Sequence, residues 1–212
     1  MSRAKRDSGF ALATLMVILA LASIAALLAM RHLWVNEKML NAEADQLRTQ
    51  QKAEAVLPVA RIDIVGPSVT NSGEVTPNLR HVAGNSTQTQ AFFPTTLTDY
   101  DLLRQRLGAN ACSTGICAPI TLDPKSSQAS YWKAQIATAM PVTASDIPYG
   151  NTTTWYWVEV FPLANTTNFV YRITALANGI MPGSTSVLQA VWVRDTPTSS
   201  TGHWRSWHVL HD

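Results

Sequence analysis

The feature that most constrains this chain is an unbroken apolar stretch, Phe10–Met30, at its N-terminus. Only Thr14 and Ser23 interrupt it with polar side chains, and about 20 apolar residues suffice to cross a bilayer as an α-helix. Three basic residues precede the stretch, namely Arg3, Lys5 and Arg6. Because basic residues ahead of a first span stay on the cytoplasmic side, the pattern predicts that the chain after Met30 faces outward.

The same residues are compatible with a cleaved secretory signal peptide. Such a signal has a basic start, an apolar core of roughly 7–15 residues and small residues before the cleavage site. The segments 20–22 (Ala-Leu-Ala) and 23–25 (Ser-Ile-Ala) would both serve as that site. From these residues alone, a retained span and a cleaved signal remain alternatives.

The chain stays helical in character from Arg31 to Ala55, where good helix formers dominate and neither Gly nor Pro occurs. We expect Pro58 to end this helix. A helix from Phe10 to Ala55 would be roughly 70 Å long, with its second half amphipathic. The expected apolar stripe comprises Leu33, Leu40, Ala44, Leu47, Val56 and Leu57. A plain membrane anchor with a juxtamembrane helix fits this periodicity equally well.

The C-terminal third of the chain has the composition of β-strands. Aromatic and β-branched residues alternate with polar ones in four segments, 155–161, 169–175, 186–194 and 203–210. Short polar connections between them favour an antiparallel meander. One face of such a sheet can pack on the amphipathic part of the helix. The sequence therefore predicts an α+β fold, in which a long N-terminal α-helix packs on an antiparallel β-sheet.

The middle of the chain is less regular. Its pattern predicts a strand over 61–65, an exposed loop over 71–90, and helices over 98–107 and 127–139. We expect Thr98 or Asp99 to cap the first of these helices and Gly108 to stop it. Pro141 should end the second, whose buried face would include Trp132.

Composition agrees with an exported protein. Charged residues make up 14% of the 212 residues, below the quarter or so that is typical, and the net charge of +2 is too small to indicate nucleic acid binding. Beyond the helix about 155 residues remain, which is enough for one domain with its own core.

The two cysteines, Cys112 and Cys117, are predicted to form one local disulfide, because an even number at close spacing in an exported chain is typical of such a bond. Gly115 gives the six-residue ring the freedom to close. A ring this small contributes at most about 2–3 kcal/mol. The spacing is two residues longer than the Cys-x-x-Cys redox motif, and no second Cys or His pair lies nearby to complete a zinc site.

Tryptophans and histidines gather near the C-terminus. On a regular strand His203 and His211 would share a face and His208 would point away, so we expect no metal site. Aromatic residues on strands usually belong to the core, and the alternative is a surface patch for a sugar or a partner. The members of that patch would be Trp192, Trp204 and Trp207, accompanied by Trp155 and Trp157.

The chain offers no recognisable catalytic motif. It has no Gly-x-Ser-x-Gly elbow of the serine hydrolases and no Gly-rich loop for phosphate. We therefore expect neither an enzyme nor a bound cofactor.

The junction at Gly9 and Phe10 resembles the class III signal of type IV pilins and pseudopilins. In that family prepilin peptidase cuts after the glycine and methylates the new N-terminal residue, and the apolar stretch is kept as membrane anchor and later as fibre core. The resemblance thus implies cleavage after Gly9 and N-methylation of Phe10. The fifth mature residue is usually Glu, thought to pair with a neighbour's N-terminal ammonium, whereas here it is Thr14. Some minor pilins also lack this Glu, so the difference argues against a major pilin only.

Two strand motifs near the C-terminus are similar to those of PilX-type minor pilins. Residues 171–175 read Tyr-Arg-Ile-Thr-Ala, and residues 187–194 contain Leu-Gln and end in Arg194. The loop from Cys112 to Cys117 also resembles a short cysteine loop of that group. The tail beyond Arg194 and the segment 71–90 depart from the group's pattern. The order of the motifs along the chain carries the resemblance.

Membership in this group would imply a minor pilin that primes or caps type IV pili and supports pilus biogenesis, adhesion and twitching motility. Residues 1–9 would be a removed leader, 10–30 the transmembrane and fibre-core half of the helix, 31–56 its amphipathic half, and 57–212 the β-rich head. The partners would be prepilin peptidase, other minor pilins, the major pilin and a large tip adhesin. The subunit would sit in the bacterial inner membrane with a periplasmic head, and then in the pilus on the cell surface.

An alternative function is a membrane-anchored or secreted β-rich binding module, either an adhesin or a sugar-binding protein, that uses the tryptophans. It predicts saturable glycan binding by the part of the chain after the helix.

Overall fold

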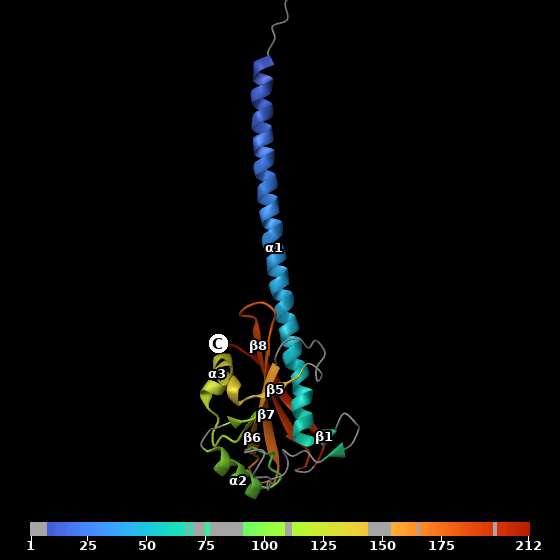
Figure 1. Ribbon diagram of the computed structural model, residues 1–212, viewed down its shortest axis with the longest axis vertical. Helices are drawn as coiled ribbons and strands as arrows, with labels where there is room; N and C mark the ends of the chain where they lie inside the picture. The colour runs from blue at the N-terminus through green and yellow to red at the C-terminus, as the bar shows by residue number, and fades with distance from the viewer. Residues whose placement is uncertain are drawn as a thin grey trace, which may run out of the picture. The chain divides into compact units, whose positions relative to one another are not determined.

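The computed structural model describes residues 8–66, 68–69, 75–76, 91–108, 112–143, 154–164, 166–196 and 199–212 (Figure 1). The chain divides into two compact units, residues 1–44 and 45–212, and one helix, α1 (Ser8–Val65), runs through both. Residues 1–7 of the predicted leader lie outside the described residues. So does the predicted loop 71–90, apart from β2 (Val75–Thr76), which pairs with β1 (Ser68–Val69).

In the first unit, α1 is long and apolar enough to cross a membrane. Every described side chain from residue 12 to residue 43 is exposed, and the most apolar window of the helix has none of its residues buried by the rest of the chain. The hydroxyl of Ser23 donates a hydrogen bond to the carbonyl of Leu19 (2.7 Å), so this polar side chain is satisfied within the helix. The predicted apolar helix is therefore confirmed, and by length and composition it could span a membrane.

The second unit is built on a seven-stranded sheet in the order β3-β4-β6-β7-β8-β9, in which β3 spans Cys112–Ser113. A seventh strand, β5 (Met140–Val142), pairs with β6. The four predicted strands are confirmed as β6 (Thr154–Pro162), β7 (Phe169–Asn178), β8 (Thr185–Arg194) and β9 (Gly202–Leu210), joined as an antiparallel meander. Among the strand pairs that the structure describes, only that of β4 (Ile116–Cys117) with β6 is parallel. With α1 packed on this sheet, the predicted α+β class is confirmed.

The two faces of the sheet carry two separate apolar clusters. One face packs with the second half of α1, and its central row pairs Val158, Ile173 and Ala190 across three strands. The opposite face packs with α3 (Ala129–Ala134), whose Trp132 contacts Trp157 with ring centroids 5.1 Å apart. Accordingly, α3 and the C-terminal part of α1 lie on opposite sides of the strands in Figure 1.

The buried stripe of α1 agrees with the predicted one at Val56 and Leu57 and differs from it at the three earlier leucines. Leu33, Leu40 and Leu47 are 61–69% exposed. The residues that the sheet buries follow the helical repeat further along, namely Asp45, Thr49, Lys52, Ala53, Val56, Leu57, Ala60 and Ile64. Leucine spacing alone suggested the wrong stripe, because small and polar residues make up most of the face that contacts the sheet.

Pro58 does not end the helix, which continues to Val65, so the strand predicted over 61–65 is wrong. A proline inside a helix removes one backbone hydrogen bond and costs about 3 kcal/mol. The ring of Pro58 is exposed, while Ala60 and Ile64 in the following turn are fully buried. Burial of an aliphatic side chain such as Ile64 stabilises by about 1.5–3 kcal/mol, which offsets much of that cost.

Polar contacts near both ends fix the packed part of α1 to the sheet. The carboxylate of Asp45 accepts hydrogen bonds from the backbone N–H groups of Ile180 and Met181 (3.0 Å each) in the turn between β7 and β8. Near the other end, the hydroxyl of Tyr156 donates to Asp63 (2.6 Å). The guanidinium of Arg194 donates to the carbonyl of Ile64 (3.0 Å), one of the carbonyls that a helix C-terminus leaves without an intrahelical partner.

The two short predicted helices have different outcomes. The first is confirmed as α2 (Leu97–Leu107) with Gly108 at its end, although its cap is Thr96 and Asp99 completes a capping box with it. The second breaks into η2 (Pro124–Ser127), α3 and η3 (Ile136–Thr138), and Pro141 lies in β5 (Met140–Val142). Trp132 is buried as expected, because it anchors α3 to the sheet.

The predicted disulfide is confirmed between Cys112 and Cys117, which face each other across β3 (Cys112–Ser113) and β4. Thr114 and Gly115 form the turn, and both have positive φ (47° and 77°), as a two-residue hairpin turn requires. Gly115 also donates to the carbonyl of Thr138 (2.7 Å) and accepts from the N–H of Val158 (2.6 Å). The hairpin is thus fixed to β6.

Replacing Gly115 tests this close approach. A Cβ there would lie 2.7 Å from the Cβ of Met140 and 2.8 Å from the carbonyl of Tyr156. Gly115→Ala should destabilise the head by about 2–4 kcal/mol, since backbone strain and overpacking add. Gly183→Ala is the matched control, because φ is also positive (85°) but no atom lies within 4 Å, so only about 1–2 kcal/mol is expected. Thermal unfolding in detergent micelles measures both, and equal losses would contradict the account.

Asp45 should make stability depend on pH. The N–H of Met181, and then that of Ile180, hold the pKa of Asp45 below its ordinary value. Because its pKa is lower in the folded state, ionised Asp45 stabilises the fold at pH values above the unfolded-state pKa of about 3.9. This stabilisation is lost as the pH falls through the folded-state pKa. Melting temperatures of the wild type and of Asp45→Asn should therefore converge below about pH 4. Asp101→Asn, an exposed acid on α2, is the control and should run parallel to the wild type.

Candidate functional site

The predicted processing site lies at the start of α1. Gly9 and Phe10 fall in its first turn, and Thr14 lies one turn further on an exposed face. The large apolar side chains that follow are more than half exposed for most of the segment, for example Leu12 at 67%, Leu19 at 58% and Met30 at 68%. This segment can therefore insert into a bilayer or pack against other helices through any side.

The structure separates the predicted tryptophan patch into a core part and a surface part. Trp192 and Trp157 are fully buried, so including Trp192 in a surface patch was wrong. The indole of Trp192 packs on Tyr171 with ring centroids 5.7 Å apart. Trp204 and Trp207 are 40% and 55% exposed. Of the predicted patch of Trp192, Trp204 and Trp207, these two therefore lie at the surface.

A β-bulge brings Trp204 and Trp207 to one face of the sheet. Residues three apart on a regular strand point to opposite faces. Here Trp207 pairs with Ala190 and Trp204 pairs with Trp192, and the register shifts by one residue between these pairs at Arg205. Both indoles therefore lie on the face that packs with α1. The bulge also places His203 and His208 together on the other face of the sheet. Regular alternation predicted that these two side chains would lie on different faces.

The two indoles line a groove of about 240 Å³ against α1. Its other wall is formed by Glu54, Leu57 and Pro58. One carboxylate oxygen of Glu54 accepts a hydrogen bond from the side chain of Gln50 (3.1 Å). No ion pair to Glu54 is present among the residues that the structure describes. The groove thus combines apolar walls, two aromatic faces and one acid.

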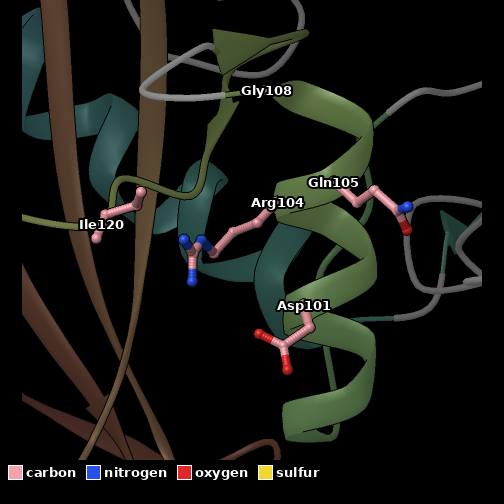
Figure 2. Close-up of a pocket in the computed structure, with 5 residues that line it drawn as sticks. All are labelled: Asp101, Arg104, Gln105, Gly108 and Ile120. Atoms are coloured by element: carbon pink, nitrogen blue, oxygen red, sulfur yellow. The ribbon is translucent and has the colours of Figure 1, made fainter.

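A second, more open pocket of about 450 Å³ lies beside α2. Figure 2 shows Arg104 extending toward Ile120, with Asp101 on the same side of the helix and Gln105 pointing away. The guanidinium of Arg104 also lies over the ring of Tyr100, 5.8 Å from its centroid. Opposite charges one turn apart on an open surface give this pocket no clear preference for a class of ligand.

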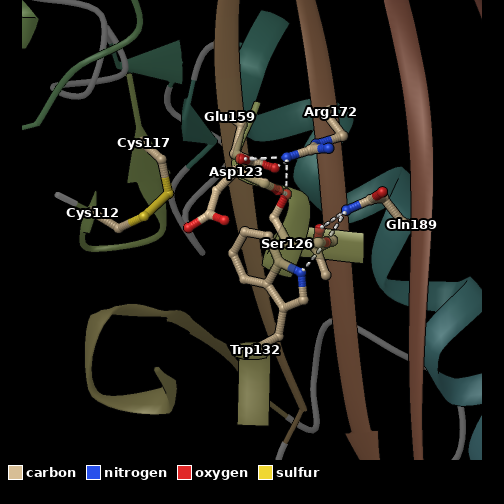
Figure 3. A network of polar contacts seen from close by, with 9 residues as sticks. Cys112, Cys117, Asp123, Ser126, Trp132, Glu159, Arg172 and Gln189 are labelled. Atoms are coloured by element: carbon tan, nitrogen blue, oxygen red, sulfur yellow. Dashed lines mark hydrogen bonds and ion pairs between the residues drawn. A yellow bond between two sulfur atoms is a disulfide. The ribbon is translucent and has the colours of Figure 1, made fainter. Parts of the chain in front are cut away.

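A buried polar network occupies the other face of the sheet (Figure 3). Arg172 makes two hydrogen bonds to Glu159 (2.6 and 2.7 Å) and one to the hydroxyl of Ser126 (2.7 Å). The carbonyl of Ser126 in turn accepts hydrogen bonds from Trp132 (2.9 Å) and Gln189 (3.3 Å). Burial raises the pKa of Glu159, and Arg172 opposes that shift. This network holds η2 on the sheet and leaves no reactive group open to solvent.

No group of three His, Cys, Asp or Glu side chains that could hold a metal ion occurs in the described part of the chain. His203 instead pairs with Asp195 at the surface (3.1 Å).

Comparison with known proteins gives no relative: no protein-family model, no curated protein and no solved structure matches the chain.

The network of Figure 3 gives a stability prediction. Arg172→Met would leave the carboxylate of Glu159, whose side chain is 6% exposed, without its cation, at an expected cost of about 3–5 kcal/mol. The double variant Glu159→Met with Arg172→Met removes both charges and should be more stable than Arg172→Met alone. Denaturant unfolding measures the three proteins, and a double variant less stable than Arg172→Met would contradict the account.

Proposed function

We propose that the chain is a minor pilin of the PilX type, which assembles with other minor pilins to prime or cap type IV pili. The observation that carries the proposal is α1, a helix whose first unit exposes apolar side chains all round and whose continuation packs on a β-sheet. Such a helix fits two successive environments, a bilayer and the helical core of a fibre.

Processing is the first step of this function. Prepilin peptidase would remove residues 1–9 and methylate Phe10, and the retained segment would hold the subunit in the inner membrane. During assembly the same exposed side chains would exchange lipid for the helices of neighbouring subunits. No change in the fold of the head is needed for this exchange.

The residue at position 14 bears on the place of the subunit in the fibre. An unpaired carboxylate in an apolar environment is costly, so it is useful only where a neighbour's ammonium meets it. Thr14 carries no charge and lies on a helix that can serve at a position without that neighbour. A priming or capping position therefore suits this chain better than repeated positions along the fibre.

The head would lie in the periplasm and later on the cell surface. An oxidised cysteine pair is consistent with that compartment. Its neighbours would be other minor pilins and the major pilin, and together they would hold a large adhesin at the tip of the pilus. In this way the subunit would support adhesion and twitching motility.

A second candidate function is a membrane-anchored or secreted β-rich binding module, either an adhesin or a sugar-binding protein. The exposed pair Trp204 and Trp207 favours it, because indole faces stack well on sugar rings and on side chains. This function requires no cleavage after Gly9.

The decisive measurement is the mass and N-terminal sequence of the mature protein from cells with and without prepilin peptidase. We expect a chain that begins at N-methylated Phe10 in the presence of the peptidase, and an uncut chain in its absence. A start at Met1 would leave an anchored module. A start near Leu21, Ala26 or Met30 that does not depend on the peptidase would indicate a classical signal peptide and contradict the pilin proposal.

A further inference from the structure

We infer that the groove between α1 and β9 is a binding site for a Lys or Arg side chain carried by an extended segment of another polypeptide. The groove is lined by Glu54, Leu57 and Pro58 on the helix and by Trp204 and Trp207 on the strand. This inference concerns residues 45–212 alone and does not depend on the proposed function.

Charge is the first argument. Glu54 is the only charged residue among the five that line the groove. One of its oxygens accepts a hydrogen bond from Gln50, and the described ion pairs do not involve it. A half-buried carboxylate beside apolar walls interacts more strongly with a cation than a fully solvated one does. The groove therefore selects for positive charge.

The aromatic faces give the second argument. A cation over the face of an indole is attracted by the ring quadrupole, and Trp is the strongest of the aromatic residues in this respect. Elsewhere in this chain the pattern is already used, since the ammonium of Lys38 lies 4.8 Å from the ring centroid of Trp34. Among the described residues no cation lies over Trp204 or Trp207. These two indole faces can therefore take a cation from another molecule.

Size and position point to a side chain on an extended segment. A volume of about 240 Å³ is below the range of roughly 300–1,000 Å³ that holds whole drug-sized ligands, but it can take one long side chain. Leu57 and the ring of Pro58 would cover its methylene groups. The groove borders β9, the last strand of the sheet, whose side chains from His203 to His208 are exposed. A segment that runs beside such an edge presents alternate side chains to one face, so a basic residue could enter here.

The test uses the full chain in detergent micelles and follows the indole N–H signals of its seven tryptophans by NMR. Trp204→Phe and Trp207→Phe assign the two signals of the groove. The probe is an acetylated, amidated peptide of alternating Thr and Lys, and the matched peptide of alternating Thr and Glu is the control. We expect saturable shifts of the Trp204 and Trp207 signals with the Lys peptide alone, weaker at high salt.

Three variants separate the groove from general electrostatics. Glu54→Gln keeps the shape of the side chain and removes its charge, so it should weaken binding about tenfold or more. Trp207→Leu keeps an apolar side chain and removes the π face, so it should also weaken binding. Glu37→Gln removes an exposed acid outside the head and should leave binding unchanged. Unshifted signals of the buried Trp157 and Trp192 would report that each variant is folded.

Three results would overturn the inference: no shift with the Lys peptide up to millimolar concentration, equal binding by the wild type and Glu54→Gln, or equal loss in Glu37→Gln. Shifts produced by a neutral oligosaccharide such as maltotriose, and not by the Lys peptide, would also overturn it and favour a sugar site.

Discussion

The head depends on one packing contact, that between residues 45–64 of α1 and one face of the sheet. The stripe that makes this contact contains Ala53 and Ala60, which let the helix approach the strands closely, and Val56 and Ile64, which fill the space between them. Polar groups limit where the helix can lie: Asp45 meets the turn between β7 and β8, and Arg194 meets the last carbonyls of the helix. Burial supplies most of the stabilisation, and these polar groups fix the register.

The same contact explains why α1 passes Pro58. Local propensity favours an end there, but the turn after Pro58 carries Ala60, Asp63 and Ile64, each of which has a partner in the sheet. Tertiary packing thus overrides a local signal. The result matters for the surface as well, because the exposed ring of Pro58 forms one wall of the groove that Trp204 and Trp207 complete.

The predictable parts of the structure are those governed by local chemistry. The apolar helix, the four long strands, the stop at Gly108 and the pairing of Cys112 with Cys117 each follow from composition, turn residues or close spacing. The parts that sequence reasoning missed depend on distant contacts. The leucine stripe was misassigned because the sheet selects alanines and polar residues on α1. The predicted helix over 127–139 is broken at Gln128 and Gln135, on either side of α3, whose Trp132 packs on Trp157 of the sheet.

The candidate binding surface shows the same limit. Sequence reasoning found its tryptophans by composition, yet included Trp192, whose side chain fills the core. Nothing in the sequence marks the bulge at Arg205, and without that extra residue Trp204 and Trp207 would lie on opposite faces. Neither could the sequence indicate that Glu54, about 150 residues away along the chain, would join them, since that depends on the register between α1 and β9.

The layout of the contacts along α1 also decides how the head would respond to mechanical load. The buried stripe from Asp45 to Ile64 covers about 29 Å of helix at ~1.5 Å per residue. A pull along the helix axis acts parallel to this interface, so its contacts are loaded together in shear rather than peeled apart one after another. Asp45, the first residue of the stripe, contacts the turn that joins β7 to β8. At the other end of the stripe, Ile64 contacts Arg194, which lies on β8, the second strand of that hairpin. Tension would therefore pass into β7 and β8, the two middle strands of the four-stranded meander, which are also the most extensively paired of the sheet.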